Sequence, residues 1–141
     1  AKKSPRAKSP TATRRKRYTF QLGAEQFIFV KSFAARNDVR ASEVMRGLLF
    51  LLETDINIAG RLIDEIFQDT DEIISRHMVM KRCSLDLDEQ QHYFLKMFAV
   101  ANHIPASTIM RILLYILETD TLVAGRVLFA VEQDYNGYYK R

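Results

Sequence analysis

With 141 residues, of which 48% are hydrophobic, the chain can bury one compact core or two small halves that share a core. It has no apolar run near the ~18 residues of a membrane span, no recognisable signal peptide and a single cysteine, which together favour a reducing compartment such as the cytoplasm. The net charge of +4 is unevenly distributed, because residues 1–17 carry eight Lys or Arg and no acid, whereas residues 18–141 carry 13 basic and 17 acidic residues.

Residues 1–16 form a basic segment with almost nothing apolar to bury, so we expect this segment to be disordered in isolation. Such a segment can be a solubilising tail or linker, or an arm that lies along nucleic-acid phosphates or in a minor groove. The second interpretation is favoured by the rest of the chain. The cationic residues of this arm that precede residue 16 are Lys2, Lys3, Arg6, Lys8, Arg14 and Arg15.

Residues 17–22 and 82–87 alternate apolar and polar side chains with a period of two, which is typical of strands with one buried face. An isolated strand leaves its backbone groups unpaired, so we expect these two to pair antiparallel into one ribbon. The inward set is Tyr18, Phe20, Leu22, Cys83, Leu85 and Leu87, which makes the cysteine a buried structural thiol. The outward set is Arg17, Thr19, Gln21, Arg82, Ser84 and Asp86.

Apolar residues at helical spacing follow each strand and predict three helices per unit. In the first unit these helices run to about residue 36, from about residue 41 to residue 52, and from residue 56 to residue 67. The second helix is apolar around much of its circumference, so we expect it to be buried on several sides.

The two units are copies of each other, because adding 65 to a residue number in the first unit gives its counterpart in the second. Residues 53–55 recur as 118–120, and residues 59–61 recur as 124–126. The register runs without a gap from about residue 16 to residue 63, which excludes coincidence as a serious alternative. The predicted organisation is a basic arm (1–16), a first unit (17–67), a linker (68–80), a second unit (81–133) and a C-terminal tail (134–141).

Residues 16–22 resemble the short strand of ribbon-helix-helix proteins of the MetJ/Arc type, and residues 38–43 and 103–108 resemble the turn into the second helix of that family. The resemblance implies a mainly α-helical fold in which one two-stranded antiparallel β-ribbon covers a helical core. Most family members are homodimers, so this chain would be its own pseudo-dimer and a monomer in solution. A tandem chain with a basic arm is similar to bacterial accessory proteins of plasmid conjugation and virulence-linked T-DNA transfer, including those that bind an overdrive-type enhancer.

The resemblance implies double-stranded DNA as the partner, with the ribbon in the major groove, where each base pair shows a distinct pattern of donors and acceptors. Arg17 and Arg82 would contact guanine, Gln21 would bracket adenine, and the hydroxyl side chains between them can donate or accept. Asp86 departs from the family pattern, and it could accept from cytosine N4 or weaken its half of the site by repelling phosphate. The alternative that these are ordinary solvated strand residues stays open.

The predicted starts of the second helix in each unit would flank the ribbon. Free N–H groups at a helix start attract anions, so these starts could clamp phosphates on either side of the base contacts. Ordinary helix capping is compatible with that role. The candidate phosphate contacts are Lys16, Arg40, Ala41, Ser42, Lys81, Ala106 and Ser107.

We do not expect an enzyme, a cofactor or a metal site. His77, His92 and His103 lack metal-ligand spacing, and the sequence contains no phosphate loop, nucleophile elbow or CxxC pair. The DNA-transfer resemblance would add relaxosome or other DNA-transfer proteins as partners, and no membrane partner is expected. Two alternatives stay open: a plasmid-type transcriptional repressor with the same DNA chemistry, and a protein-interaction module that has lost base reading.

Overall fold

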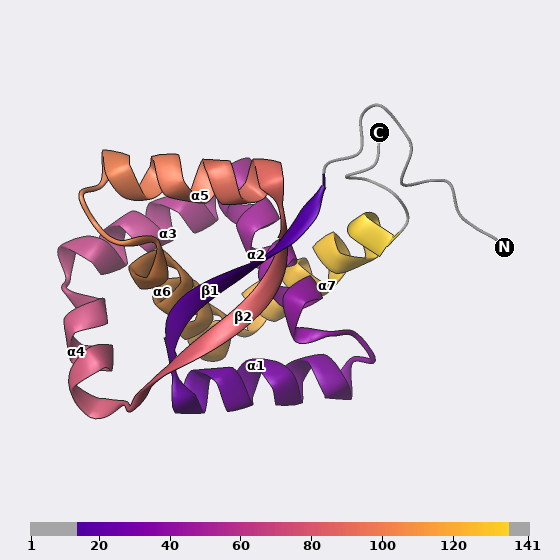
Figure 1. Ribbon diagram of the computed structural model, residues 1–141, viewed down its shortest axis with the longest axis horizontal. Helices are drawn as coiled ribbons and strands as arrows, with labels where there is room; N and C mark the ends of the chain where they lie inside the picture. Colours follow the sequence, from indigo (N-terminus) through magenta and orange to yellow (C-terminus); the bar gives the residue numbers. More distant parts are fainter. Residues whose placement is uncertain (1–13, 136–141) are drawn as a thin grey trace, which may run out of the picture.

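The two alternating segments form the only strands among residues 14–135, the part of the chain that the computed structural model describes. β1 (Arg15–Gly23) and β2 (Met80–Asp88) pair antiparallel into one ribbon, which crosses the middle of the molecule between α1 (Ala24–Arg36) and α5 (Glu89–Ala101) (Figure 1). The other helices are α2 (Ala41–Thr54), α3 (Ile56–Phe67), α4 (Thr70–His77), α6 (Ala106–Thr119) and α7 (Thr121–Tyr135). The predicted class, mainly helical with one two-stranded antiparallel ribbon, is confirmed.

The ribbon buries one face because apolar side chains alternate along both strands. Phe20, Leu22, Cys83, Leu85 and Leu87 are buried against the helices, and Tyr18 is half-buried. Burial raises the pKa of the Cys83 thiol, in keeping with a structural role. Beneath the ribbon lie α2 and α6, whose apolar residues are buried around most of each helix, as the sequence predicted for the first of them.

The strand register is centred on Thr19, which lies opposite Ser84 in the ladder. These two residues occupy the same position in the 65-residue repeat. The ladder closes at both ends in the same way, since Ala24 N donates to Val79 O at 2.7 Å and Glu89 N donates to Arg14 O at 2.8 Å. The ribbon therefore has equivalent ends, each leading directly into a helix.

The ribbon is longer than the alternation predicted, and β1 begins at Arg15 rather than after the basic arm. Two ion pairs account for the extension: Arg15 Nε lies 3.0 Å from Asp88 Oδ1, and Lys16 Nζ lies 2.8 Å from Glu89 Oε2. The last two residues assigned to the arm thus belong to the ribbon. The run of positive charge concealed the start of β1 in the sequence, because the acidic partners of these cations, Asp88 and Glu89, lie in the second unit.

Residues 68–80, assigned to a linker, contain the eight-residue helix α4. Only Ile74 among its apolar residues is buried, so the segment lacks the repeated apolar spacing that would have revealed a helix. At the other end of the chain, α7 continues to Tyr135, two residues beyond the predicted limit of the second unit. The rest of the predicted tail lies outside the described residues.

Tertiary hydrogen bonds hold α4 in place. Arg111 of α6 bonds Asp71 through Nε at 2.7 Å and through Nη2 at 2.8 Å, and its Nη1 donates to Gln21 O at 2.6 Å. Thr108 Oγ1 also donates to Asp71 Oδ2 at 2.9 Å. One largely buried arginine therefore joins α4, α6 and the edge of β1.

We expect Arg111→Met to lower the free energy of unfolding by about 3 kcal/mol, because it leaves the Asp71 carboxylate without its ionic partner. Arg111→Met/Asp71→Leu should recover more than half of that loss, since no unpaired charge remains. Urea unfolding measures both values, with Arg76→Ala as the control for an exposed ion pair of α4. A loss below about 1 kcal/mol for Arg111→Met would show that the bond is no stronger than a surface pair.

The half-buried Tyr18 stacks on His92 of α5, with 3.7 Å between ring centroids and 11° between ring planes. Desolvation by burial lowers the pKa of His92, and the charge of Lys96 adds to the effect. The counterpart of His92 in the first unit is Phe27, an apolar ring at the same position. Burial and the nearby Lys96 therefore favour the neutral imidazole of His92.

Protonation of His92 should destabilise the fold. Because its pKa is lower when folded than the ~6.5 of an unfolded chain, the unfolded chain binds the proton more readily. Stability is then lost as the pH falls below about 6.5. We expect His92→Phe, which copies the residue of the first unit, to show a smaller fall in thermal midpoint between pH 7.5 and 5.5 than the wild type, measured by circular dichroism. Equal falls would contradict this assignment.

Candidate nucleic-acid interface

The six outward residues predicted to read bases lie together on the solvent face of the ribbon. Five of them are exposed, namely Arg17, Thr19, Gln21, Arg82 and Ser84, and Asp86 is half-buried. Their placement follows from the strand period, which directs every second side chain away from the core. The ribbon thus presents a row of hydrogen-bonding groups with no apolar side chain among them.

Two of the three cross-strand pairs on this face are in contact. Arg17 Nε lies 3.2 Å from Asp86 Oδ1, and the Thr19 and Ser84 hydroxyl oxygens are 3.3 Å apart. In the third pair Arg82 lies opposite Gln21, and within residues 14–135 no group pairs with the Arg82 guanidinium. The two ends of the exposed face therefore differ in how their arginine is held.

The starts of α2 and α6 lie against the two edges of the ribbon. Ser42 Oγ accepts a hydrogen bond from Asp86 N at 3.0 Å, and Ser107 Oγ accepts one from Gln21 N, also at 3.0 Å. Both hydroxyls therefore bind the strands, whereas the sequence also allowed them to cap their own helices. The N-cap residues are Arg40 and Pro105, which have no side-chain oxygen to offer the first N–H groups of the helix.

The turns before these helices share one backbone conformation. Asp38 and His103 have φ values of 59° and 58°, in the left-handed region that Asp and His tolerate better than most residues. Asn37 Nδ2 donates to Phe33 O at 2.8 Å and so holds the turn that precedes α2. The same positions of the repeat therefore set the direction in which each helix starts.

Two buried arginines, to which the sequence assigned no role, anchor the ribbon edges from below. Arg46 is 2% exposed and its Nη1 donates to Asp86 O at 2.9 Å, as Arg111 does to Gln21 O. Their own backbone carbonyls accept hydrogen bonds from the buried Gln91 and Gln26, respectively. The sequence did contain a signal for this role, since an arginine occurs at the same position of both apolar helices and a buried charge needs a partner.

A basic hollow of about 470 Å³ opens beside the start of α2, at the edge of the ribbon. It contains one carboxylate, that of Asp86, and it brings predicted phosphate contacts next to three of the residues predicted to read bases, Arg17, Ser84 and Asp86. Lys31, which the sequence did not single out, also lines it. The cationic residues that line this hollow are Arg15, Lys16, Arg17, Lys31, Arg40 and Arg46.

The remaining predicted phosphate contacts are distributed over both units. Ala41 lines the basic hollow, whereas Ala106 and Ser107 lie at the corresponding start of α6. Lys81 is exposed on β2, with its ammonium 5.6 Å from the centre of the Phe27 ring. Lys16 is paired with Glu89, and the hydrogen bond from this lysine lowers the pKa of the glutamate.

Only part of the predicted arm is described. Arg14 is exposed beside the ribbon, and Arg15 is paired with Asp88. The other predicted arm cations, Lys2, Lys3, Arg6 and Lys8, lie outside the described residues.

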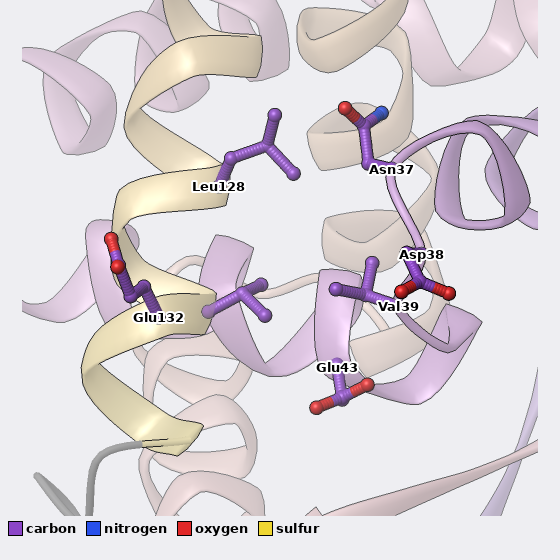
Figure 2. A pocket seen from close by; sticks show the side chains of 7 residues that line it. Asn37, Asp38, Val39, Glu43, Leu128 and Glu132 are labelled. Atoms are coloured by element: carbon purple, nitrogen blue, oxygen red, sulfur yellow. The ribbon is translucent and has the colours of Figure 1, made fainter.

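A second hollow, also about 470 Å³, lies between the α1–α2 turn and α7. Figure 2 shows Leu128 of α7 facing Asn37 and Val39 of the turn across it. Its charged lining residues are the carboxylates of Asp38, Glu43 and Glu132. The carboxylates of this hollow would repel phosphate, so we do not include it in the candidate nucleic-acid interface.

No family model matches the chain, and searches of curated proteins and of solved structures returned no significant match. Among residues 14–135, no group of three or more His, Cys, Asp or Glu side chains is placed to hold a metal ion. Within the same residues no single helix is long and apolar enough to cross a membrane, and α5 and α6 reach that length and composition only as a pair bent by 101°.

Proposed function

We propose that this chain binds duplex DNA sequence-specifically, with the ribbon in the major groove and without catalysis. The observation that carries the proposal is the exposed ribbon face, which presents arginine, amide and hydroxyl groups between two helix starts. A two-stranded ribbon fits the width of the major groove, where these groups can read base edges. The resemblance of residues 16–53 and 81–118 to ribbon-helix-helix proteins supports the same assignment.

The same proposal makes the chain an intramolecular pseudo-dimer, monomeric in solution. Its support is a set of contacts between the units, each of which occurs twice. Replacing both residues of a contact by their counterparts in the other unit, 65 positions away, gives a second contact of the same kind. The hydrogen-bonded pairs are Ser42–Asp86 with Ser107–Gln21, Arg46–Asp86 with Arg111–Gln21, and Arg61–Asp120 with Arg126–Asp55. Each of these contacts joins one unit to the other, as subunit contacts do in a symmetric dimer.

The last of these pairs involve α3 and α7, the helices added to each unit. Asp55 caps α3 by accepting from Asn57 N at 2.9 Å, while its other oxygen accepts from Arg126 at 2.8 Å. Asp120 likewise caps α7 and accepts from Arg61 at 3.3 Å. One carboxylate thus both starts a helix and ties it to the opposite unit, which supports a shared core rather than two separate domains.

The two strands of the reading face differ in sequence, so the preferred DNA site on this proposal is an imperfect palindrome or no palindrome at all. One strand presents Arg17, Thr19 and Gln21, and the other presents Arg82, Ser84 and Asp86, so one end of the face pairs Arg17 with Asp86 and the other pairs Arg82 with Gln21. A symmetric dimer would present identical sets and favour a palindrome. The chain therefore binds its site in one orientation.

Phosphate contacts on this account come from the helix starts, the basic hollow and the arm. Because residues 18–141 carry a net charge of −4, attraction to DNA depends on these local concentrations of positive charge rather than on the whole body. The arm adds sequence-independent affinity, and each phosphate that it neutralises steepens the log–log salt dependence by about 0.9.

The class of DNA site follows only from the resemblance. Accessory proteins of conjugation and T-DNA transfer suggest an enhancer or origin sequence as the target, with relaxosome proteins as further partners. A plasmid operator bound by a transcriptional repressor is the alternative, and the ribbon chemistry is the same for both.

A second candidate function is a protein-interaction module. The acidic hollow between the α1–α2 turn and α7 favours it, because a lining that combines apolar residues with three carboxylates suits a basic peptide. On this alternative the ribbon arginines would be dispensable for binding a partner.

Selection from a random duplex library at about 150 mM salt tests the proposal. We expect the intact chain to enrich one asymmetric motif and Arg17→Ala/Arg82→Ala to lose it, since each bidentate arginine–guanine contact supplies about 1–3 kcal/mol of discrimination. The matched control is Arg36→Ala/Arg76→Ala, which removes two exposed charges from helices and should keep the motif. The same motif selected by the ribbon variant would contradict the proposal.

A further inference from the structure

We infer that Asp86 is a positioning residue, whose carboxylate orients the Arg17 guanidinium for contact with a guanine. The inference rests on the proposed reading of DNA by the ribbon and deepens it, because it assigns unequal discrimination to the two arginines. The Arg17 side chain would contact its base from a restrained orientation, whereas the Arg82 side chain would have to be ordered on binding.

The pair has the geometry for this role. Arg17 and Asp86 lie directly opposite each other in the ladder, and Nε of the arginine is 3.2 Å from Oδ1 of the aspartate. This bond uses Nε alone and leaves the two terminal nitrogens available. Those nitrogens form the planar fork that matches guanine O6 and N7. The arginine side chain is 71% exposed, so the fork is accessible to a base.

Asp86 is itself held firmly enough to direct its neighbour. Its backbone N–H donates to Ser42 Oγ at 3.0 Å, and its backbone carbonyl accepts from Arg46 Nη1 at 2.9 Å. Arg46 is buried, so both backbone groups of Asp86 are fixed to α2. Only the side-chain torsions of the aspartate remain free, and the bond to Arg17 restrains them.

The second unit offers an internal comparison. Gln21 occupies the position equivalent to Asp86, and its backbone is fixed in the same way by Ser107 and Arg111. It carries an amide instead of a carboxylate, and no group of residues 14–135 pairs with the facing Arg82 guanidinium. A mobile arginine loses more rotamer freedom on binding than one that is already restrained. The two arginines should therefore discriminate guanine to different degrees.

Two other roles for Asp86 predict different behaviour. If it only repels phosphate, its removal should strengthen binding to every duplex equally. If it accepts from cytosine N4, it should keep a base preference of its own when Arg17 is absent. A positioning residue instead loses its effect once Arg17 is removed, because it acts only through that side chain.

The test measures dissociation constants for the selected duplex and for its three single-base replacements at the guanine that depends on Arg17. The proteins are the full chain, Asp86→Asn, Arg17→Ala and the double variant. We expect Asp86→Asn to reduce guanine discrimination about fivefold or more while binding of unrelated duplexes becomes tighter. In the Arg17→Ala background the same substitution should leave base preference unchanged.

An independent variant tests the same idea by gain of function. Gln21→Asp places a carboxylate opposite Arg82 and should raise discrimination at the guanine of that half-site. A preserved circular dichroism spectrum checks that these substitutions leave the fold intact.

The inference is overturned if Asp86→Asn tightens all duplexes equally, or if it changes base preference without Arg17. Failure of the proposed function gives a different result, since the wild-type chain would then select no motif at all. That result would contradict both base reading and the role of Asp86. If the chain selects a motif but Asp86→Asn discriminates guanine as well as the wild type does, only the role of Asp86 is contradicted.

Discussion

The antiparallel pairing of β1 with β2 is the constraint on which the rest of the structure depends. Neither strand can satisfy its backbone groups without the other, and they are separated in the sequence by four helices. Pairing them brings the starts of α2 and α6 to opposite edges of one ribbon, where Ser42 and Ser107 bind the strand backbone. The buried Arg46 and Arg111 then hold the same edges from the core side.

This arrangement separates the residues that stabilise the fold from those that we propose to recognise DNA. The inward face of the ribbon is apolar and packs on α2 and α6, so the outward residues are not needed for the core. The backbone anchors at Gln21 and Asp86 fix the two strands without using the outward side chains of these residues. A rigid strand with exchangeable side chains is well suited to reading a surface as regular as the major groove.

Much of the fold could be predicted from the sequence, because the informative patterns are periodic. Alternation located the strands, and the repeat predicted that residues such as Thr19 and Ser84 would play equivalent parts. The features that were missed depend on partners distant in sequence. Helix α4 is held by the bond between Asp71 and Arg111, and β1 is lengthened by the bond between Arg15 and Asp88. The pairing of Arg17 with Asp86 could not be predicted without the strand register, which depends on how the two strands align and not on either strand alone.

Methylation interference on a selected duplex tests the central claim most directly. Guanine N7 lies in the major groove, and adenine N3 lies in the minor groove. If the ribbon reads the major groove, methylation of guanine N7 at the contacted positions blocks binding, and the blocked positions are arranged asymmetrically about the centre of the site. If N7 methylation interferes nowhere while binding remains sequence-specific, the ribbon is not the reading element and the account is wrong.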